Sequence, residues 1–264
     1  NLQCVRRGMF EADWSHNGKP PGCHYSRGGN SLPSDTVRSR IRVCSTNVRG
    51  KTRWSVTPMQ YLLKHTKEFG SPCHKKGTVG LALLSQGKMK EARALAASWN
   101  EAPGDRTWTW PVAYQCIFLS EYYLKTRDKS VLRTIELLVK RLYEAQVTDP
   151  ALYKDRIHSG RPQGKNFLKG GLGHVVKIDG YGTMAITTLM AMLAWELAED
   201  CGVKLDQRYV DLAFQCIRTN TNKSGYMGYR FGRGAYSPVG RQGLSIIAHK
   251  LARDKGTEEY VARV

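Results

Sequence analysis

The stretch GGLGHVVKIDGYGTMAITTLMAMLAWELAED, residues 170–200, decides the fold of this 264-residue chain. Its first part is rich in glycine and carries His174, Asp179 and Tyr181. From Ala185 onward the residues are apolar on nearly every side of a helix, which is typical of a helix in the centre of a large fold. Polar residues interrupt this run, and a membrane span needs about 20 apolar residues. We therefore expect a central helix and no membrane span.

A second helix is expected after a break at Cys201-Gly202. Its apolar residues fall on one helical face: Val210, Ala213, Phe214 and Ile217. Polar residues take the opposite face, so this helix covers the first one rather than lying in the centre.

Similar helix pairs are expected earlier in the chain. Pro111 opens a helix that ends at the turn Thr126-Arg127-Asp128. Its partner has apolar residues at helical spacing: Val131, Ile135, Leu138 and Leu142. A short apolar helix from Val79 to Leu84 and another through Ala92 to Trp99 precede this pair. Residues 147–169 are polar and are expected to form a long loop.

These helix pairs form a weak internal repeat. Pro111 and the turn at residues 126–129 recur as Pro238 and the turn at residues 252–255, at matching separation. Repeated hairpins of one buried and one covering helix predict an all-α fold, a partial α/α toroid. A stacked solenoid is the alternative. In either arrangement the connecting loops collect at one end, where a pocket would open.

Charge divides the chain into two predicted regions. The formal net charge is +19, and residues 1–76 hold 14 Lys and Arg against 4 Asp and Glu. We predict a basic, irregular segment over 1–55 and a helical-hairpin domain over 56–264. The first segment either binds an acidic partner or is non-native translated sequence. The basic excess makes nonspecific binding of nucleic acid one expected property, and a solvated basic surface explains it equally well.

The cysteines give no sign of a metal site. The chain has seven, no CxxC pair occurs, and zinc-ligand spacing is absent. We expect no metal and no cofactor. We also expect the chain to be a piece of a longer protein, incomplete at its C-terminus, because it opens without methionine and ends inside a helical pattern. The sequence therefore leaves export undecided.

Three stretches carry a family resemblance. They are WPVAY at 110–114 with LSEYYL at 119–124, DGYGTM at 179–184, and GRQG at 240–243 with the helix that follows. Over about residues 76–264 the chain resembles a bacterial domain-of-unknown-function family, numbered 6288, which is similar to terpene-cyclase and protein-prenyltransferase α/α toroids. The resemblance implies that fold and carries over no catalytic role. The aspartate-rich motifs DxDD and DDxxD of diphosphate-using cyclases are absent from the sequence.

The glycine-rich stretch supplies candidate catalytic residues. Asp179 is a candidate general acid or base, with His174 and Tyr181 assisting. The alternative is a turn or helix-cap aspartate, a hydrogen-bonded loop histidine and a packed tyrosine.

Aromatic residues in the predicted loops supply candidate binding residues: Trp108, Trp110, Tyr226 and Tyr229. If these loops share one end, the rings form a rim suited to sugar rings, and Arg241 suits a carboxylate or sulfate. Ordinary anchoring of loops by buried rings is the alternative.

Three functional hypotheses follow. The leading one is a carbohydrate-active or carbohydrate-binding protein, such as a hydrolase or lyase on anionic glycans. The second is a non-catalytic helical-repeat module that binds another protein. The third, an isoprenoid-handling enzyme, is disfavoured because the aspartate motifs are missing. Whether the chain is an enzyme at all is left undecided by the sequence.

Overall fold

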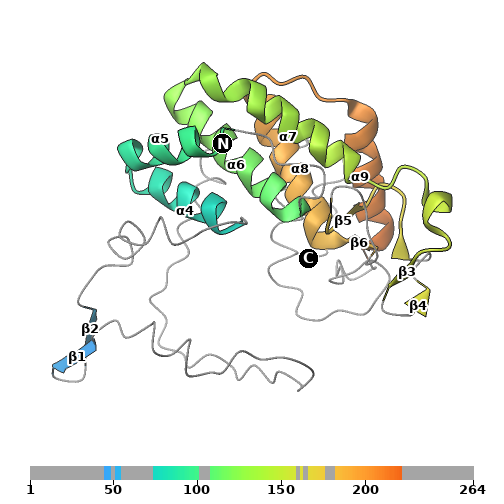
Figure 1. Cartoon of the computed structure of the whole chain (residues 1–264), viewed down its shortest axis with the longest axis horizontal. Helices are drawn as coiled ribbons and strands as arrows, with labels where there is room; N and C mark the ends of the chain where they lie inside the picture. Colours follow the sequence, from blue (N-terminus) through green and yellow to red (C-terminus); the bar gives the residue numbers. More distant parts are fainter. Residues whose placement is uncertain are drawn as a thin grey trace. The chain divides into compact units, whose positions relative to one another are not determined.

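The computed structural model describes residues 45–48, 51–54, 74–100, 108–158, 161–162, 166–175 and 182–221 (Figure 1). The chain divides into two units, Asn1–Phe69 and Gly70–Val264. In the first unit, strands β1 (Ser45–Val48) and β2 (Lys51–Trp54) pair antiparallel, with Ser45 opposite Trp54. The N-terminal segment, which was predicted to be irregular, therefore contains a short antiparallel strand pair.

The second unit is mostly helical, which confirms the predicted all-α class at that level. The α-helices among its described residues are α4 (His74–Ser85), α5 (Met89–Ser98), α6 (Thr109–Thr126), α7 (Leu132–Glu144), α8 (Ala185–Asp200) and α9 (Gln207–Asn220). Short 3-10 turns are η2 (Lys129–Val131) and η3 (Pro150–Tyr153). Two-residue strands pair antiparallel as β3 (Ile157–His158) with β4 (Arg161–Pro162), and β5 (Leu172–Gly173) with β6 (Thr183–Met184).

Two of these helices are buried and two cover them. In α8, 12 of 16 residues are buried, and in α6, 11 of 18 are buried. In α7 and α9 only five residues each are buried, all on one face. Helix α6 packs against α8, α4 and α7, and α8 also contacts α7 and α9 (Figure 1). The predicted alternation of a buried helix with a covering helix is confirmed for these four. None of the described helices is long and apolar enough to span a bilayer.

The turns between paired helices lie where the sequence predicts them. Helix α6 is followed by Arg127 in the left-handed conformation, with φ of 58°. Helix α8 is followed by Cys201 and then Gly202, with φ of 90°. The backbone N–H of Cys201 still donates to helical carbonyls. Gly202 therefore occupies the left-handed position that commonly ends a helix.

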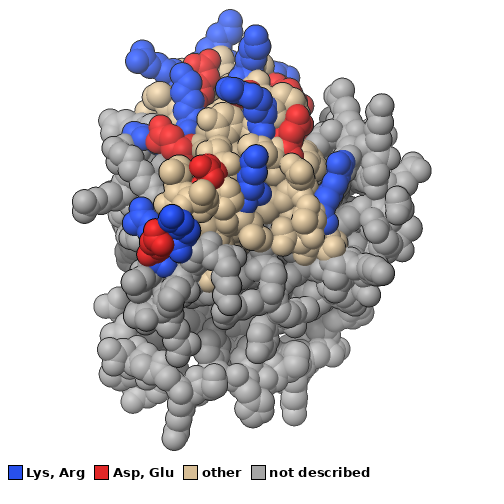
Figure 2. All heavy atoms as spheres, turned by 90° about the vertical axis from the view of Figure 1, so that its right-hand side faces the viewer, with Lys and Arg blue, Asp and Glu red and all other residues tan. Residues whose placement is uncertain are grey.

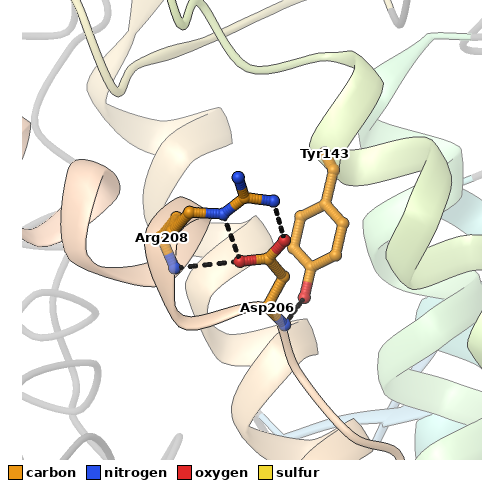
Figure 3. A network of polar contacts seen from close by, with 3 residues as sticks. All are labelled: Tyr143, Asp206 and Arg208. Carbon is orange, nitrogen blue, oxygen red and sulfur yellow. Dashed lines mark hydrogen bonds and ion pairs between the residues drawn. The ribbon is translucent and has the colours of Figure 1, made fainter.

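The start of α9 is capped and tied to α7 (Figure 3). The Asp206 carboxylate accepts the backbone N–H of Arg208 at 3.1 Å and also pairs with its guanidinium. The hydrogen bonds from Arg208 lower the pKa of the Asp206 carboxyl below its usual value. The backbone N–H of Asp206 donates to the Tyr143 hydroxyl at 2.9 Å. Since Tyr143 also stacks on Tyr209 and contacts the Trp195 ring, this corner joins α7, α8 and α9.

Helix α4 packs closely on α6 through two glycines. A Cβ atom at Gly77 would lie 2.6 Å from the Cβ of Tyr114, and one at Gly80 would overlap the Phe118 ring. The sequence prediction started this helix only at Val79, because glycine is a poor helix former. The structure starts it at His74, and the glycines provide the close approach that packing on two rings requires.

Residues 170–175 connect the ends of three helices. The N–H of Gly170 donates to the Val147 carbonyl at 2.7 Å, and the N–H of Val147 donates to the Gly171 carbonyl at 2.9 Å, just beyond α7. Strand β5 pairs with β6, which leads directly into α8. The next residues then pair with the start of α6. The expectation that connecting segments meet at one end therefore holds for these described segments.

The peptide groups of Leu172 are buried against the apolar helix α8. Their partners are the two threonines that interrupt its apolar run. The Leu172 N–H donates to the Thr188 hydroxyl at 3.0 Å, and its carbonyl accepts from the Thr187 hydroxyl at 2.8 Å. Buried backbone groups without partners are costly, so these hydroxyls allow the strand to lie on the helix.

A buried glutamine fixes the same segment on its other side. The Gln146 side-chain amide donates to the Gly170 carbonyl at 3.0 Å and to the Tyr209 carbonyl at 2.9 Å. This amide therefore joins the end of α7, the glycine-rich segment and the start of α9.

Gly170 offers a test of how closely this segment approaches α9. Its φ is +86°, and a Cβ atom there would overlap the Leu212 carbonyl oxygen. Gly202 has a similar φ of +90° with no atom within 4 Å of that position. Gly202→Ala is expected to lower the free energy of unfolding by about 1–2 kcal/mol, the cost of the left-handed conformation.

We expect Gly170→Ala to lower the free energy of unfolding by about 1–3 kcal/mol more than Gly202→Ala does, because it adds a steric overlap to the same conformational cost. Urea unfolding of both variants measures the difference. Equal losses would mean that the segment does not need its close approach to Leu212.

Three cysteines are buried in the described helical region. Burial raises the pKa of the Cys116 and Cys216 thiols from 9.0 to about 12, and that of Cys201 to about 11. The Cys116 thiol lies 3.7 Å from the Ala194 carbonyl oxygen, and the Cys201 thiol lies 3.5 Å from that of Ser120. Thiols of this kind behave as small apolar side chains.

The raised thiol pKa values predict a loss of stability at alkaline pH. Above pH 9 the unfolded chain releases thiol protons that the folded chain keeps until about pH 11–12. The free energy of unfolding should therefore fall as the pH rises from 9 to 11. Each such thiol contributes up to about 1.4 kcal/mol per pH unit.

Denaturant unfolding of the wild-type chain and Cys116→Ala at several pH values measures this contribution. The free energy of unfolding should fall less steeply with pH in the variant, by up to about 1.4 kcal/mol per pH unit, because one titrating thiol is missing. All other titrating groups are the same in the two chains. Identical slopes would contradict the burial of this thiol.

Candidate functional site

Three of the eight predicted site residues lie in the described part of the chain. They are Trp108, Trp110 and His174, two proposed as binding residues and one as a catalytic residue. The other five lie outside the described residues: Asp179, Tyr181, Tyr226, Tyr229 and Arg241. The structure brings the three described residues together, although 64 residues separate Trp110 from His174 in the sequence.

Backbone pairing brings these residues together. Trp108 has an extended backbone at the start of α6, with φ of −66° and ψ of 141°. It forms an antiparallel bridge with Val175, and the N–H of Thr109 donates to the His174 carbonyl at 2.6 Å. Beyond β5, the glycine-rich segment is therefore joined to the first residues of α6 by this isolated bridge.

The side chains repeat this association. The indole N–H of Trp110 donates to Nδ1 of His174 at 3.0 Å. The centres of these two rings are 6.4 Å apart, and the Trp108 ring lies tilted at 5.5 Å from the His174 ring. His174 is therefore in ring contact with both tryptophans.

A fourth ring belongs to the site and was not proposed from the sequence. Tyr114 stacks on Trp110 at 6.5 Å with an interplanar angle of 15°. Burial raises the pKa of its phenol. The signal was present in the sequence, because residues four apart share a helical face. We call these four residues, Trp108, Trp110, Tyr114 and His174, the Trp–His cluster.

Exposure separates one member of the Trp–His cluster from the rest. Trp108 is 54% exposed as a residue, whereas the other three residues are partly buried. The cluster therefore presents one indole to solvent and uses the remaining rings as support.

The hydrogen bond from Trp110 decides the proton position on His174. An indole can only donate, so Nδ1 of His174 must carry a lone pair and no proton. In the neutral ring the proton then lies on Nε2, an assignment that rests on the hydrogen-bond network. A histidine that acts as a base usually has Nδ1–H donating to a carboxylate or carbonyl. The arrangement here favours a hydrogen-bonding role over that of a general base.

Comparison with known proteins identifies a family and no named relative. A family model described as "Domain of unknown function (DUF6288)" matches residues 57–261. The chain belongs to this family. The resemblance found in the sequence is confirmed, and the match begins earlier than the predicted residue 76. No curated protein and no solved structure matches the chain.

Charge around this part of the DUF6288 chain is nearly balanced. Residues 76–100, 108–156, 166–175 and 182–221 hold 16 Lys and Arg against 12 Asp and Glu. Figure 2 shows both signs interspersed over one face of the described region. Most of the net charge of +19 therefore comes from the rest of the sequence. Among the described residues, no group of three or more potential metal ligands lies together.

The bond between Trp110 and His174 in this DUF6288 chain can be tested by a double-mutant cycle. Trp110→Phe keeps an aromatic ring and removes the donor, and His174→Ala removes the acceptor. We expect a coupling free energy of about 0.5–1.5 kcal/mol from the unfolding of the two single variants and the double variant.

Trp99→Phe serves as the matched control, because Trp99 stacks on Phe118 and lies in a different ring contact. Combined with His174→Ala it should be additive. A coupling as small as that of the control would show that the bond contributes nothing to stability.

Proposed function

We propose that this DUF6288 chain binds carbohydrate, with Trp108 as the flat face on which a sugar ring stacks. The observation that carries the proposal is the exposed indole at the start of α6, held beside a histidine whose own orientation is fixed by Trp110. Aromatic faces suit the C–H faces of sugar rings, and a nearby polar group gives orientation.

The Trp–His cluster is also held in place before any ligand arrives. Trp108 is bridged to Val175, and the next residue, Thr109, is bonded to the His174 carbonyl. A platform fixed from both sides loses little conformational entropy on binding, which favours affinity. The exposed Leu152 on η3 has no comparable setting in the described contacts, although its exposure is higher at 73%.

The finer proposal is a hydrolase or lyase acting on anionic glycans. Asp179 would be the acid or base, Tyr181 would assist it, and Tyr226, Tyr229 and Arg241 would bind substrate. The position of Asp179 supports this, since it follows Val175 by four residues and Val175 is bridged to Trp108. The geometry of His174 favours binding over proton transfer, so we assign it to substrate binding within this proposal.

The architectural proposal is a partial α/α toroid over residues 56–264, preceded by the basic segment 1–55. The alternation of buried α6 and α8 with covering α7 and α9 supports a ring of inner and outer helices. The family match from residue 57 supports a boundary between residues 55 and 56, whereas the two compact units of the chain divide later, between Phe69 and Gly70.

Substitution of Trp108 tests carbohydrate binding. The full chain is screened by thermal shift against neutral and anionic oligosaccharides, since a ligand at a hundred times its Kd stabilises a fold by about 2.7 kcal/mol. For any glycan that binds, Trp108→Ala should weaken binding about tenfold, because the stacking face is lost. Trp108→Phe should retain most of the affinity.

Leu152→Ala is the control, because it removes an exposed apolar side chain away from the cluster and should leave binding unchanged. If no glycan binds, or if Trp108→Ala binds as well as the wild-type chain, the carbohydrate proposal is wrong. The protein-interaction hypothesis then takes its place.

A further inference from the structure

Three helices begin at the end of the fold that carries Trp108. Helix α6 packs against both α4 and α8 and lies between them in Figure 1. Gly77 of α4 lies against Tyr114 of α6, and Gly80 lies against Phe118. Since these contacts follow the same order along both helices, α4 and α6 run parallel.

The contacts between α6 and α8 show the same direction. The Cys116 thiol of α6 lies 3.7 Å from the Ala194 carbonyl oxygen. Further along, the Cys201 thiol, just beyond α8, lies 3.5 Å from the Ser120 carbonyl oxygen. Helices α6 and α8 therefore also run parallel.

The first residues of the three helices lie at nearly the same level. Gly77, the fourth residue of α4, lies against the sixth residue of α6. Ala194, the tenth residue of α8, contacts the eighth residue of α6. The three helix starts are therefore level to within about one helical turn.

Trp108 lies near the middle of this shared end. It directly precedes α6, the middle helix, and it is bridged to Val175 in the segment that follows β5. Packed helices are about 8–10 Å apart, so the end formed by three of them is about 16–20 Å wide. A ligand that lies on Trp108 therefore has the start of α4 on one side and the start of α8 on the other.

The exposure of Trp108 limits what a single sugar unit can gain there. Pockets for small ligands bury most of the ligand surface, whereas Trp108 is 54% exposed and offers a flat ring. Stacking on one aromatic ring lowers a Kd by about tenfold to a hundredfold. The freedom that a ligand loses on association costs more than this. Useful affinity therefore needs further contacts, and the protein surface for them lies on both sides of Trp108.

We infer that the ligand is a linear glycan recognised through its internal units. One unit stacks on Trp108, and its neighbours in the glycan lie over the starts of α4 and α8. The inference rests on the proposed carbohydrate binding and adds the class of ligand, which is a polymer rather than a mono- or disaccharide.

The dependence of affinity on glycan length tests this inference. The probes are the monosaccharide, trisaccharide, hexasaccharide and soluble polymer of xylose and of galacturonate, titrated into the full chain by calorimetry. Each Kd is expressed per sugar unit, which removes the statistical advantage of repeated units. A glycan that binds only in the wider screen is tested as the same series.

For the glycan that binds, the Kd per sugar unit should fall at least about tenfold from the monosaccharide to the hexasaccharide. The polymer should then match the hexasaccharide per sugar unit, because its internal units far outnumber its ends. Trp108→Ala should weaken the hexasaccharide and the polymer equally, by about tenfold. Leu152→Ala, the control, should weaken neither.

The outcomes separate this inference from carbohydrate binding itself. A monosaccharide that binds as well per unit as the hexasaccharide shows recognition of a single unit and overturns the inference alone. A polymer that is much weaker per unit than the hexasaccharide shows recognition of a chain end, with the same consequence. A Trp108→Ala variant that loses the hexasaccharide and keeps the polymer also contradicts the inference. Failure of every glycan overturns carbohydrate binding and the inference with it.

Discussion

The structure depends on how one buried peptide segment satisfies its hydrogen bonds. Leu172 lies against the apolar helix α8. The Thr187 hydroxyl donates to its carbonyl, and the Thr188 hydroxyl accepts its N–H. With these bonds made, the neighbouring residues can pair with the end of α7 on one side and with β6 on the other. Replacing the threonines by apolar residues would leave a buried donor and acceptor without partners, which costs more than the bonds themselves contribute.

The same segment also positions the Trp–His cluster. Two residues after Leu172, His174 meets the indole of Trp110, and Val175 pairs with Trp108. The position of the Trp–His cluster therefore follows from the docking of the strand on α8. On its other side the cluster depends on α4, because Gly77 allows that helix to approach Tyr114 closely. A site built in this way is supported by packed helices rather than by a free loop.

Much of the fold could be predicted because helical periodicity records which faces are buried. The apolar residues proposed for the α7 face, among them Ile135, Leu138 and Leu142, are all buried, and α8 is the central helix expected.

The predictions failed where a local rule was overridden. Pro111 was expected to open α6, but the helix starts at Thr109, since a proline within the first turn breaks no helical hydrogen bond. Gly77 obscured the first turn of α4, which the sequence prediction left outside the helix. The sequence predicted individual members of the site, because aromatic and histidine side chains suit binding, but it did not predict which of them meet. The contact between Trp110 and His174 left no trace in one sequence, since nothing local specifies a pairing over 64 residues.

That sequence separation has a consequence for the order of folding. Helix pairs such as α6 with α7 close short loops, whereas the pairing of Trp108 with Val175 closes a longer loop that contains both of these helices. The entropy lost on closing a loop grows with its length, so contacts of this range form only when other contacts already hold the chain compact. The Trp–His cluster should accordingly be assembled after α6 and α7 have paired. A newly synthesised chain would carry helices before it carries the Trp–His cluster, and the fluorescence of Trp108 and Trp110 would report a later step of folding rather than its beginning.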